Sequence, residues 1–236
     1  NSAMPYVLRA RYRHVLGADR DPVRHKVERL GALMGRDPPP SPRLWLDDAH
    51  RRAAVALMPG DTPVLAMAPC ANWRGKQWPA ASFAHLAQRL TSAGGALAGA
   101  KIAVFGASGE RDEANKVLKA LLNDRVIDLV GIDGLLTVAA CLERATLFVG
   151  NDSGLMHMAA AVGTRTVGLF GPSRDEIYAP WGDDGVAVRT PESFTELTTA
   201  PDYDHRTTDT LMRSLTVDAV ADAATSLVGR ESLVAS

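Results

Sequence analysis

The feature that most constrains the fold of this chain is a regular alternation of short apolar runs with longer segments of helical periodicity. Short apolar runs bounded by turn residues predict buried strands, and apolar residues that recur every three or four positions predict helices. The predicted strands cover residues 64–68, 102–105, 126–130, 147–149, 166–170 and 186–188. The predicted helices cover residues 82–90, 111–122, 137–144, 157–162 and 217–227.

Strands and helices that alternate in this way form β-α-β units, which place a parallel sheet between two layers of helices. Right-handed crossovers then give an α/β fold with a doubly wound, Rossmann-like sheet over residues 44–230. Ligands of such folds bind beyond the carboxyl ends of the strands. We therefore expect the functional residues in the loops that follow strands.

Two unusual segments precede this domain. Residues 6–34 are rich in arginine. The ordinary interpretation is one or two solvated amphipathic helices. The functional alternatives are a contact for anionic substrates or membrane headgroups and an interdomain surface. Residues 35–42 hold four prolines, which cannot continue a helix and favour an extended linker. The predicted domain boundary therefore lies at residue 43.

Composition excludes several classes of protein. A chain of 236 residues with 46% hydrophobic residues can bury a core without disulfides or structural metals. The formal net charge of −1 argues against a general nucleic-acid binder. No apolar run approaches the ~20 residues that span a bilayer, so we expect a cytoplasmic protein. The two cysteines, Cys70 and Cys141, lack metal-ligand spacing and are interpreted as buried free thiols.

The most informative loop follows the predicted strand at 147–149. Asn151, Asp152, Ser153 and Gly154 lead directly into a helix that carries His157. Asp152 or Ser153 can cap this helix, and its free N–H groups and dipole suit an anion such as a diphosphate. The alternative is a capped helix with a packed histidine. A serine-protease interpretation of Asp152, Ser153 and Gly154 fails, because the fold of those proteases is all-β and this segment lies in an α/β alternation.

Two further loops carry polar residues in equivalent positions. Lys76 lies in the loop at 69–79, where an ammonium group matches a phosphate oxygen. Gly106 and Glu110 lie in the loop at 106–110, where a carboxylate can accept hydrogen bonds from ribose or a base. Each has an ordinary alternative: an exposed lysine and a first-turn glutamate. Together, the three loops predict a nucleotide site, although the Gly-x-Gly-x-x-Gly pattern is absent.

These residues carry a resemblance to a known family. Residues 148–172 closely resemble the carboxyl-terminal signature of glycosyltransferase family 9, the lipopolysaccharide heptosyltransferases and their relatives. Residues 76–79 look like that family's lysine and Trp-Pro element, and residues 106–110 resemble its loop with a nucleotide-contacting glutamate. The resemblance covers residues 60–225.

The resemblance implies a GT-B architecture, in which two Rossmann-like domains face each other across a cleft. The carboxyl-terminal domain would hold a nucleotide-diphospho-sugar donor, often ADP-heptose, without a metal or other cofactor. The residues implied to contact the diphosphate are Lys76, Asn151, Asp152, Ser153, Gly154 and His157. Those implied at the nucleoside are Gly106 and Glu110. The general base would be a carboxylate of the amino-terminal domain, and we interpret Asp202 and Asp204 as turn residues.

The implied activity is transfer of a sugar, such as heptose, to a lipopolysaccharide core or a related glycan or glycolipid acceptor, with inversion. A peripheral contact with the cytoplasmic face of the inner membrane would accompany it. A sugar-nucleotide epimerase or hydrolase of similar fold, or a non-catalytic nucleotide-sugar-binding module, remains the alternative. Residues 1–43 lack the family's opening strand and glycine-rich loop. We expect them to be the end of an acceptor domain in a longer chain.

Overall fold

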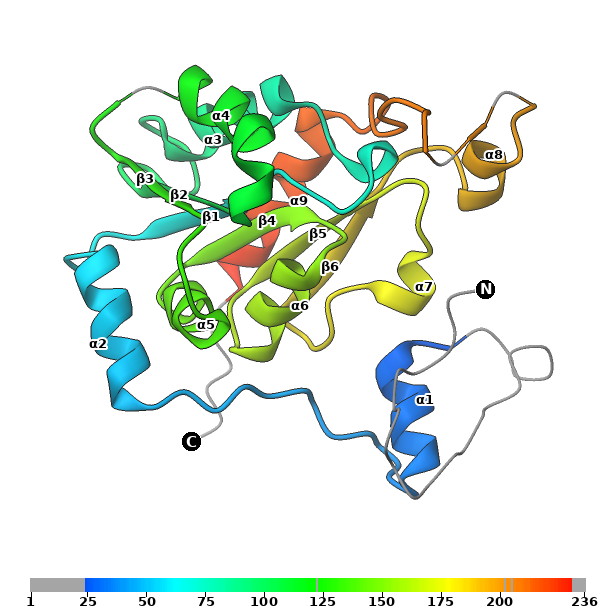
Figure 1. The fold of residues 1–236 in the computed structure, drawn as a ribbon, viewed down its shortest axis with the longest axis horizontal. Coiled ribbons are helices and arrows are strands. Elements are labelled where there is room, and N and C mark those ends of the chain that lie inside the picture. The colour runs from blue at the N-terminus through cyan, green and yellow to red at the C-terminus, as the bar shows by residue number, and fades with distance from the viewer. Residues whose placement is uncertain (1–23, 122, 202, 205, 231–236) are drawn as a thin grey trace.

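A single parallel sheet organises the protein (Figure 1). The computed structural model describes residues 24–230 apart from 122, 202 and 205. Within that part of the chain, six strands lie in the order β3-β2-β1-β4-β5-β6, and every neighbouring pair is parallel. The strands are β1 (Val64–Ala68), β2 (Lys101–Gly106), β3 (Val126–Val130), β4 (Leu147–Asn151), β5 (Thr166–Phe170) and β6 (Gly185–Arg189).

Helices connect the strands. The longer ones are α1 (Lys26–Leu33), α2 (Asp48–Leu57), α3 (Ala80–Thr91), α4 (Arg111–Ala120), α5 (Leu135–Glu143), α6 (Gly154–Ala161) and α9 (Val217–Gly229). Short helical turns occupy several loops: η1 (Arg74–Lys76), η2 (Ser108–Glu110), α7 (Asp175–Tyr178) and α8 (Phe194–Thr198).

Helices cover both faces of the sheet because successive side chains of a strand point to opposite sides. In β1, Leu65 and Met67 pack in the core under α3, α4 and α9. Ala66 and Ala68 belong to the second core, under α2, α5 and α6. All five residues of β1 are buried, as expected for a central parallel strand. The predicted doubly wound α/β fold is therefore confirmed.

All six predicted strands and all five predicted helices are present, with ends that differ by a few residues. Helix α2 lies outside this prediction. Ala54 is its buried residue, and most of its apolar positions are alanines among charged residues, so its apolar face is weak. Asp47 caps its first turn by accepting a hydrogen bond from His50 N at 2.9 Å. Arg51 pairs with Glu143 of α5. Asp47 before the helix was a local signal for its start.

Helix α1 is the described part of the arginine-rich segment, and residues 6–23 of that segment lie outside the described residues. Residues 38–47, after α1, contain no helix or strand, as the proline-rich composition predicts. The segment at α1 lies beside α7 (Figure 1). His25 Nε2 lies 2.9 Å from Ala179 O, and Lys26 Nζ lies 4.1 Å from the centre of the Tyr178 ring. The domain boundary at residue 43 stays a prediction.

Two smaller expectations concern buried thiols and membrane spans. Cys70 and Cys141 are free and buried, and burial raises their pKa values to about 12 and about 11. The Glu110 and Glu113 carboxylates add to the effect on Cys70. Among the described residues, no helix is long and apolar enough to cross a membrane.

Candidate functional site

The strand order creates a crevice between β1 and β4. The chain leaves β1 toward β2 on one side and leaves β4 toward β5 on the other, so the loops after these two neighbours diverge. This is the topological switch point at which open α/β sheets bind ligands. The loop after β1 carries Lys76, and the loop after β4 carries residues 152–154.

A cavity of about 1530 Å³ opens at this crevice, which is large enough for a nucleotide-sized ligand. It brings together seven of the eight predicted site residues. They are Lys76, Gly106, Glu110, Asp152, Ser153, Gly154 and His157. The eighth, Asn151, does not line the cavity.

Lys76 and Asp152 form an ion pair across the crevice. The distance from Lys76 Nζ to Asp152 Oδ2 is 2.5 Å, and their side chains are 21% and 7% exposed. The prediction that Asp152 or Ser153 caps α6 is wrong. The Asp152 carboxylate is directed to Lys76, and Ser153 occupies the cap position without a side-chain cap bond. The sequence did not show that Lys76, which lies 76 positions earlier in the chain, binds this carboxylate.

The start of α6 therefore keeps its anion-binding character. The first N–H groups of a helix have no partner within the helix, and the side chain of Ser153 satisfies none of them here. The Ser153 hydroxyl itself is buried and has no hydrogen-bond partner among the described residues. A Cβ at Gly154 would meet no atom within 4 Å, so the backbone is open to a ligand. This geometry suits a phosphate group.

His157 lies in the first turn of α6, as predicted. The residue keeps part of its surface exposed to solvent, and the rest forms part of the cavity wall. Loss of solvent there lowers its pKa, and the Asp152 carboxylate opposes this shift. The positive charges of His25, Lys26 and Lys76 lower the pKa further. An anion bound among these groups would reverse their effect and favour the charged imidazole.

Asn151 has a different position from the one predicted. It is fully buried, and its side chain joins β4 to the loop that carries Lys76. The Asn151 Oδ1 atom accepts a hydrogen bond from Trp78 N at 3.0 Å. Its Nδ2 group donates to Pro69 O at 2.8 Å. The side chain is thus occupied in holding the loop, and it positions Lys76 from outside the cavity.

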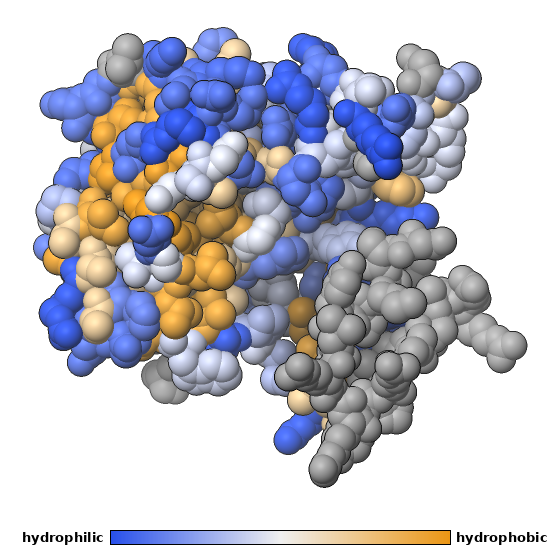
Figure 2. All heavy atoms as spheres, viewed as in Figure 1, coloured by the Kyte–Doolittle hydropathy of each residue, from blue (hydrophilic) through white to orange (hydrophobic). Residues whose placement is uncertain are grey.

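The cavity is apolar at the end formed by β2, β3 and α5. The residues of this wall are Phe105, Leu129, Ile132, Leu135 and Val138. Figure 2 shows hydrophobic side chains gathered on this face over α5 and the neighbouring strands, and Leu135 is 74% exposed. Glu110 lies at the edge of the wall, where its Oε2 atom accepts a hydrogen bond from Ala107 N at 2.8 Å.

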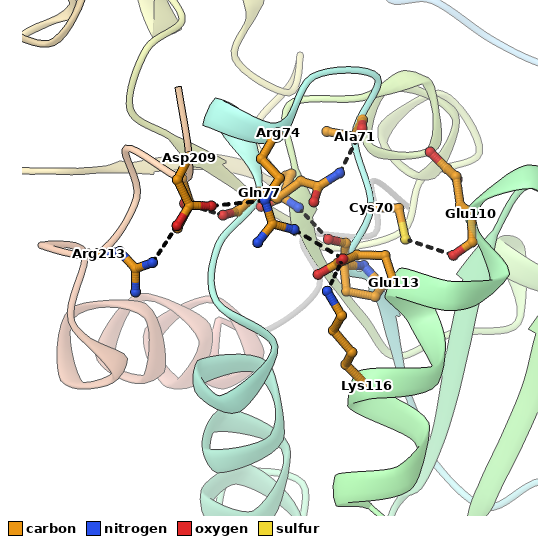
Figure 3. A network of polar contacts seen from close by, with 12 residues as sticks. Cys70, Ala71, Arg74, Gln77, Glu110, Glu113, Lys116, Asp209 and Arg213 are labelled. Atoms are coloured by element: carbon orange, nitrogen blue, oxygen red, sulfur yellow. Dashed lines mark hydrogen bonds and ion pairs between the residues drawn. The ribbon is translucent and has the colours of Figure 1, made fainter. Parts of the chain in front are cut away.

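A network of polar contacts holds the loop after β1 from the outside (Figure 3). Arg74 donates to Asp209 at 2.9 Å and to Glu113 at 3.1 Å. Hydrogen bonds from the Thr210 N–H group, Arg213 and Arg74 lower the pKa of Asp209 to about 2. The Leu211 N–H donates to Gly75 O at 3.0 Å. The segment around residues 209–211 therefore supports the loop that presents Lys76.

The opposite end of the cavity is basic, and the sequence indicated this only in part. Arg24, Lys26 and Arg29 contribute from α1 and the residue before its cap, and Arg174 contributes from the loop after β5. A contact with an anionic substrate was one of the alternatives for the arginine-rich segment. Asp202 lies outside the described residues, and Asp204 accepts a hydrogen bond from Arg206 N.

The arrangement of these residues agrees with the comparison to known families. Residues 3–202 match glycosyltransferase family 9 (heptosyltransferase). The chain belongs to glycosyltransferase family 9. The resemblance expected from residues 148–172 is thereby confirmed, because this stretch and the other two loops of the site fall within the match.

Relatives of this family 9 chain include heptosyltransferases. The chain is 31% identical to lipooligosaccharide heptosyltransferase 2 of Haemophilus influenzae over 134 residues, which are 55% of this chain and 37% of the relative. A family 9 glycosyltransferase from Veillonella parvula has a similar structure, with a TM-score of 0.66 and 24% identity. That likeness covers 79% of this chain and 53% of the other.

The E. coli heptosyltransferase WaaC, solved with ADP, is also similar in structure, with a TM-score of 0.57 and 20% identity. It is matched over 84% of this chain and 53% of its own. This family 9 chain spans about half the length of these solved structures and less of the curated relative. The structural likenesses confirm the predicted fold within a GT-B architecture.

Proposed function

We propose that this family 9 chain binds a nucleotide-diphospho-sugar in the crevice between β1 and β4. The complete transferase would pass the sugar, a heptose, to a lipopolysaccharide core or a related glycan or glycolipid acceptor. One observation carries the proposal. The Lys76 ammonium group, the uncapped start of α6 and His157 converge on one cavity that has an apolar wall beside them.

The polar centre of the cavity matches the charge of a diphosphate. The N–H groups at residues 153–154 provide donors and the positive end of a helix dipole. Lys76 adds a full positive charge, and His157 gains one when an anion raises its pKa. These groups would stabilise the departing nucleotide diphosphate through fixed positive charge and N–H donors, without a metal ion.

The apolar wall matches the nucleoside. A base can pack against Phe105, Leu129 and Val138, while Glu110 accepts hydrogen bonds from the ribose. Adenine is the favoured base, because the related WaaC was solved with ADP. Transfer with inversion would use a carboxylate base on the acceptor side to deprotonate the attacking hydroxyl. A contact with the cytoplasmic face of the inner membrane would bring the acceptor within reach.

Calorimetric titration with ADP, UDP, GDP and ADP-heptose tests the donor site. We expect preferential binding of the adenine ligands, weakened by about tenfold or more in Lys76→Met and His157→Gln, because charged hydrogen bonds contribute roughly 1.5–3 kcal/mol. Lys119→Met, an exposed lysine outside the cavity, is the matched control and should bind like the wild type. Equal heats for all ligands, or no effect of Lys76→Met, would contradict the proposal.

Product analysis separates transfer from the alternative reactions. With ADP-heptose and a lipopolysaccharide core acceptor, the transferase should release ADP only when the acceptor is present and invert the anomeric centre. Release of ADP and free heptose regardless of acceptor would indicate a hydrolase. Recovery of an epimerised nucleotide-sugar would indicate an epimerase.

A further inference from the structure

The cavity continues past the loops that follow β1 and β4 and reaches the end of β5. In the sheet, β5 lies directly beside β4, so the loop after β5 adjoins the start of α6. Pro172, Ser173 and Arg174 of this loop line the cavity. Ser173 and Arg174 give this end a hydroxyl group and a guanidinium group, which the apolar wall at β2 and β3 lacks.

Ser173 carries a buried hydroxyl group that the fold does not use. The residue is 7% exposed, and its Oγ atom has no hydrogen-bond partner among the described residues. Buried hydroxyl groups are normally hydrogen-bonded, because burial without a partner costs free energy. A group of this kind on the wall of a cavity is suited to bind a polar ligand.

Arg174 lies next to this hydroxyl in the chain and is held by an aromatic ring. Its guanidinium carbon lies 4.8 Å from the centre of the Phe194 ring, and Phe194 also lines the cavity. The contact between Arg174 and Glu176 spans 4.0 Å, which is too long for a hydrogen bond. The loop thus places an unpaired hydroxyl group and a guanidinium group in the wall of the same cavity.

We propose that Ser173 and Arg174 bind the transferred sugar of the donor. The inference rests on the proposed function and on the order of the loops along the sheet edge. The apolar wall lies at β2 and β3, and the residues proposed to bind the diphosphate follow β1 and β4. From β2 to β5 there are three strand spacings, or roughly 14 Å, comparable to the span of an extended nucleotide-diphospho-sugar. The sugar therefore falls at the end of β5.

The test compares the affinities of Ser173→Ala for ADP and for ADP-heptose. We expect ADP to bind as in the wild type and ADP-heptose to bind about 3- to 10-fold more weakly, from the loss of one hydrogen bond. Arg174→Met should also weaken ADP-heptose more than ADP. Thermal unfolding of Ser173→Ala should match the wild type, because the hydroxyl group has no partner within the described fold.

Ser108→Ala is the matched control, because Ser108 lines the cavity at the nucleoside end. It should leave the ratio of the two affinities unchanged. If Ser173→Ala also leaves this ratio unchanged while the wild type binds ADP, the sugar subsite is overturned and the donor site stands. If the wild type binds neither ADP nor ADP-heptose, both the subsite and the proposed function are overturned.

Discussion

Lys76 and Asp152 form an ion pair, so a phosphate group bound by Lys76 would share this lysine with the Asp152 carboxylate. Both side chains are largely buried, and the pair lies at the mouth of the proposed diphosphate site. Breaking a buried ion pair on one side leaves an uncompensated charge, so stability and binding respond differently to each change.

Lys76→Met should lower the free energy of unfolding by about 1–3 kcal/mol, because the Asp152 carboxylate stays buried without its partner. The double variant Lys76→Met/Asp152→Asn removes that charge and should recover most of the stability. ADP binding should remain impaired in both variants. Urea denaturation together with calorimetry measures both effects. Recovery of ADP binding in the double variant would show that Lys76 does not bind the nucleotide.

The lowered pKa of His157 leads us to expect that nucleotide binding depends on pH. Its pKa is lowered in the free protein, so the imidazole is mostly neutral near pH 7. A bound diphosphate raises this pKa, so binding takes up a proton and the affinity rises as the pH falls through the His157 pKa values. Between pH 8 and 6, wild-type affinity for ADP should increase by about 2- to 10-fold more than that of His157→Gln.

The phosphate of ADP also changes its protonation over this pH range, and this affects binding to both proteins equally. The difference between the wild type and His157→Gln therefore isolates the effect of the imidazole. Parallel pH profiles of the two dissociation constants would show that the ring does not contact the diphosphate.

At the scale of elements, the loop between β1 and α3 depends on contacts from distant parts of the chain. Asn151 holds it from inside through Trp78 N and Pro69 O, and Arg74 holds it from outside through Asp209 and Glu113. The difference in burial decides which contact matters for stability. Asn151 is fully buried, whereas the Arg74 side chain is 50% exposed.

Asn151→Ala should lower the free energy of unfolding by about 2–4 kcal/mol, because it leaves two buried backbone groups without partners. ADP affinity should fall as well, since the loop that carries Lys76 loses its inner support. Chemical denaturation and calorimetry measure the two effects.

Arg74→Met is the matched control for this loop. Its exposed ion pairs should contribute less than about 1 kcal/mol to stability. A loss of stability in Arg74→Met equal to that in Asn151→Ala would show that the outer network, and not the buried amide, holds the loop.

At the scale of the whole molecule, the distribution of charge matters more than its sum. The formal net charge is −1, yet the cavity is lined by five arginines and lysines and by three acidic residues. The basic residues are Arg24, Lys26, Arg29, Lys76 and Arg174, and the acidic ones are Glu110, Asp133 and Asp152. Clefts that collect one sign of charge attract ligands of the opposite sign.

ADP binding should therefore weaken by about tenfold when sodium chloride is raised from roughly 0.05 M to 0.5 M, because salt screens the partly exposed cations. Adenosine, which lacks the phosphates, should bind with little dependence on salt. The same calorimetric titration measures both ligands. An equal response of ADP and adenosine would show that the basic lining does not contribute to binding.

Local sequence patterns were sufficient to predict the sheet, most of its helices and the loops that form the candidate site. Periodicity is a local property, so the runs at 64–68 and 166–170 predict their strands without knowledge of any partner. The rule that ligands bind at the carboxyl ends of strands then singled out Lys76 and residues 152–157.

The contacts of these residues depend on parts of the chain that are distant in sequence. Asn151 contacts Trp78 across 73 positions, and Asp152 contacts Lys76 across 76 positions, so no local pattern could reveal either pair. Helix α2 is held by Glu143, which lies 92 positions from Arg51. The lack of a hydrogen-bond partner for the Ser173 hydroxyl group could be established only from the positions of its neighbours in the described fold. Hydrogen-bond partners are chosen by proximity in space, which the fold alone establishes.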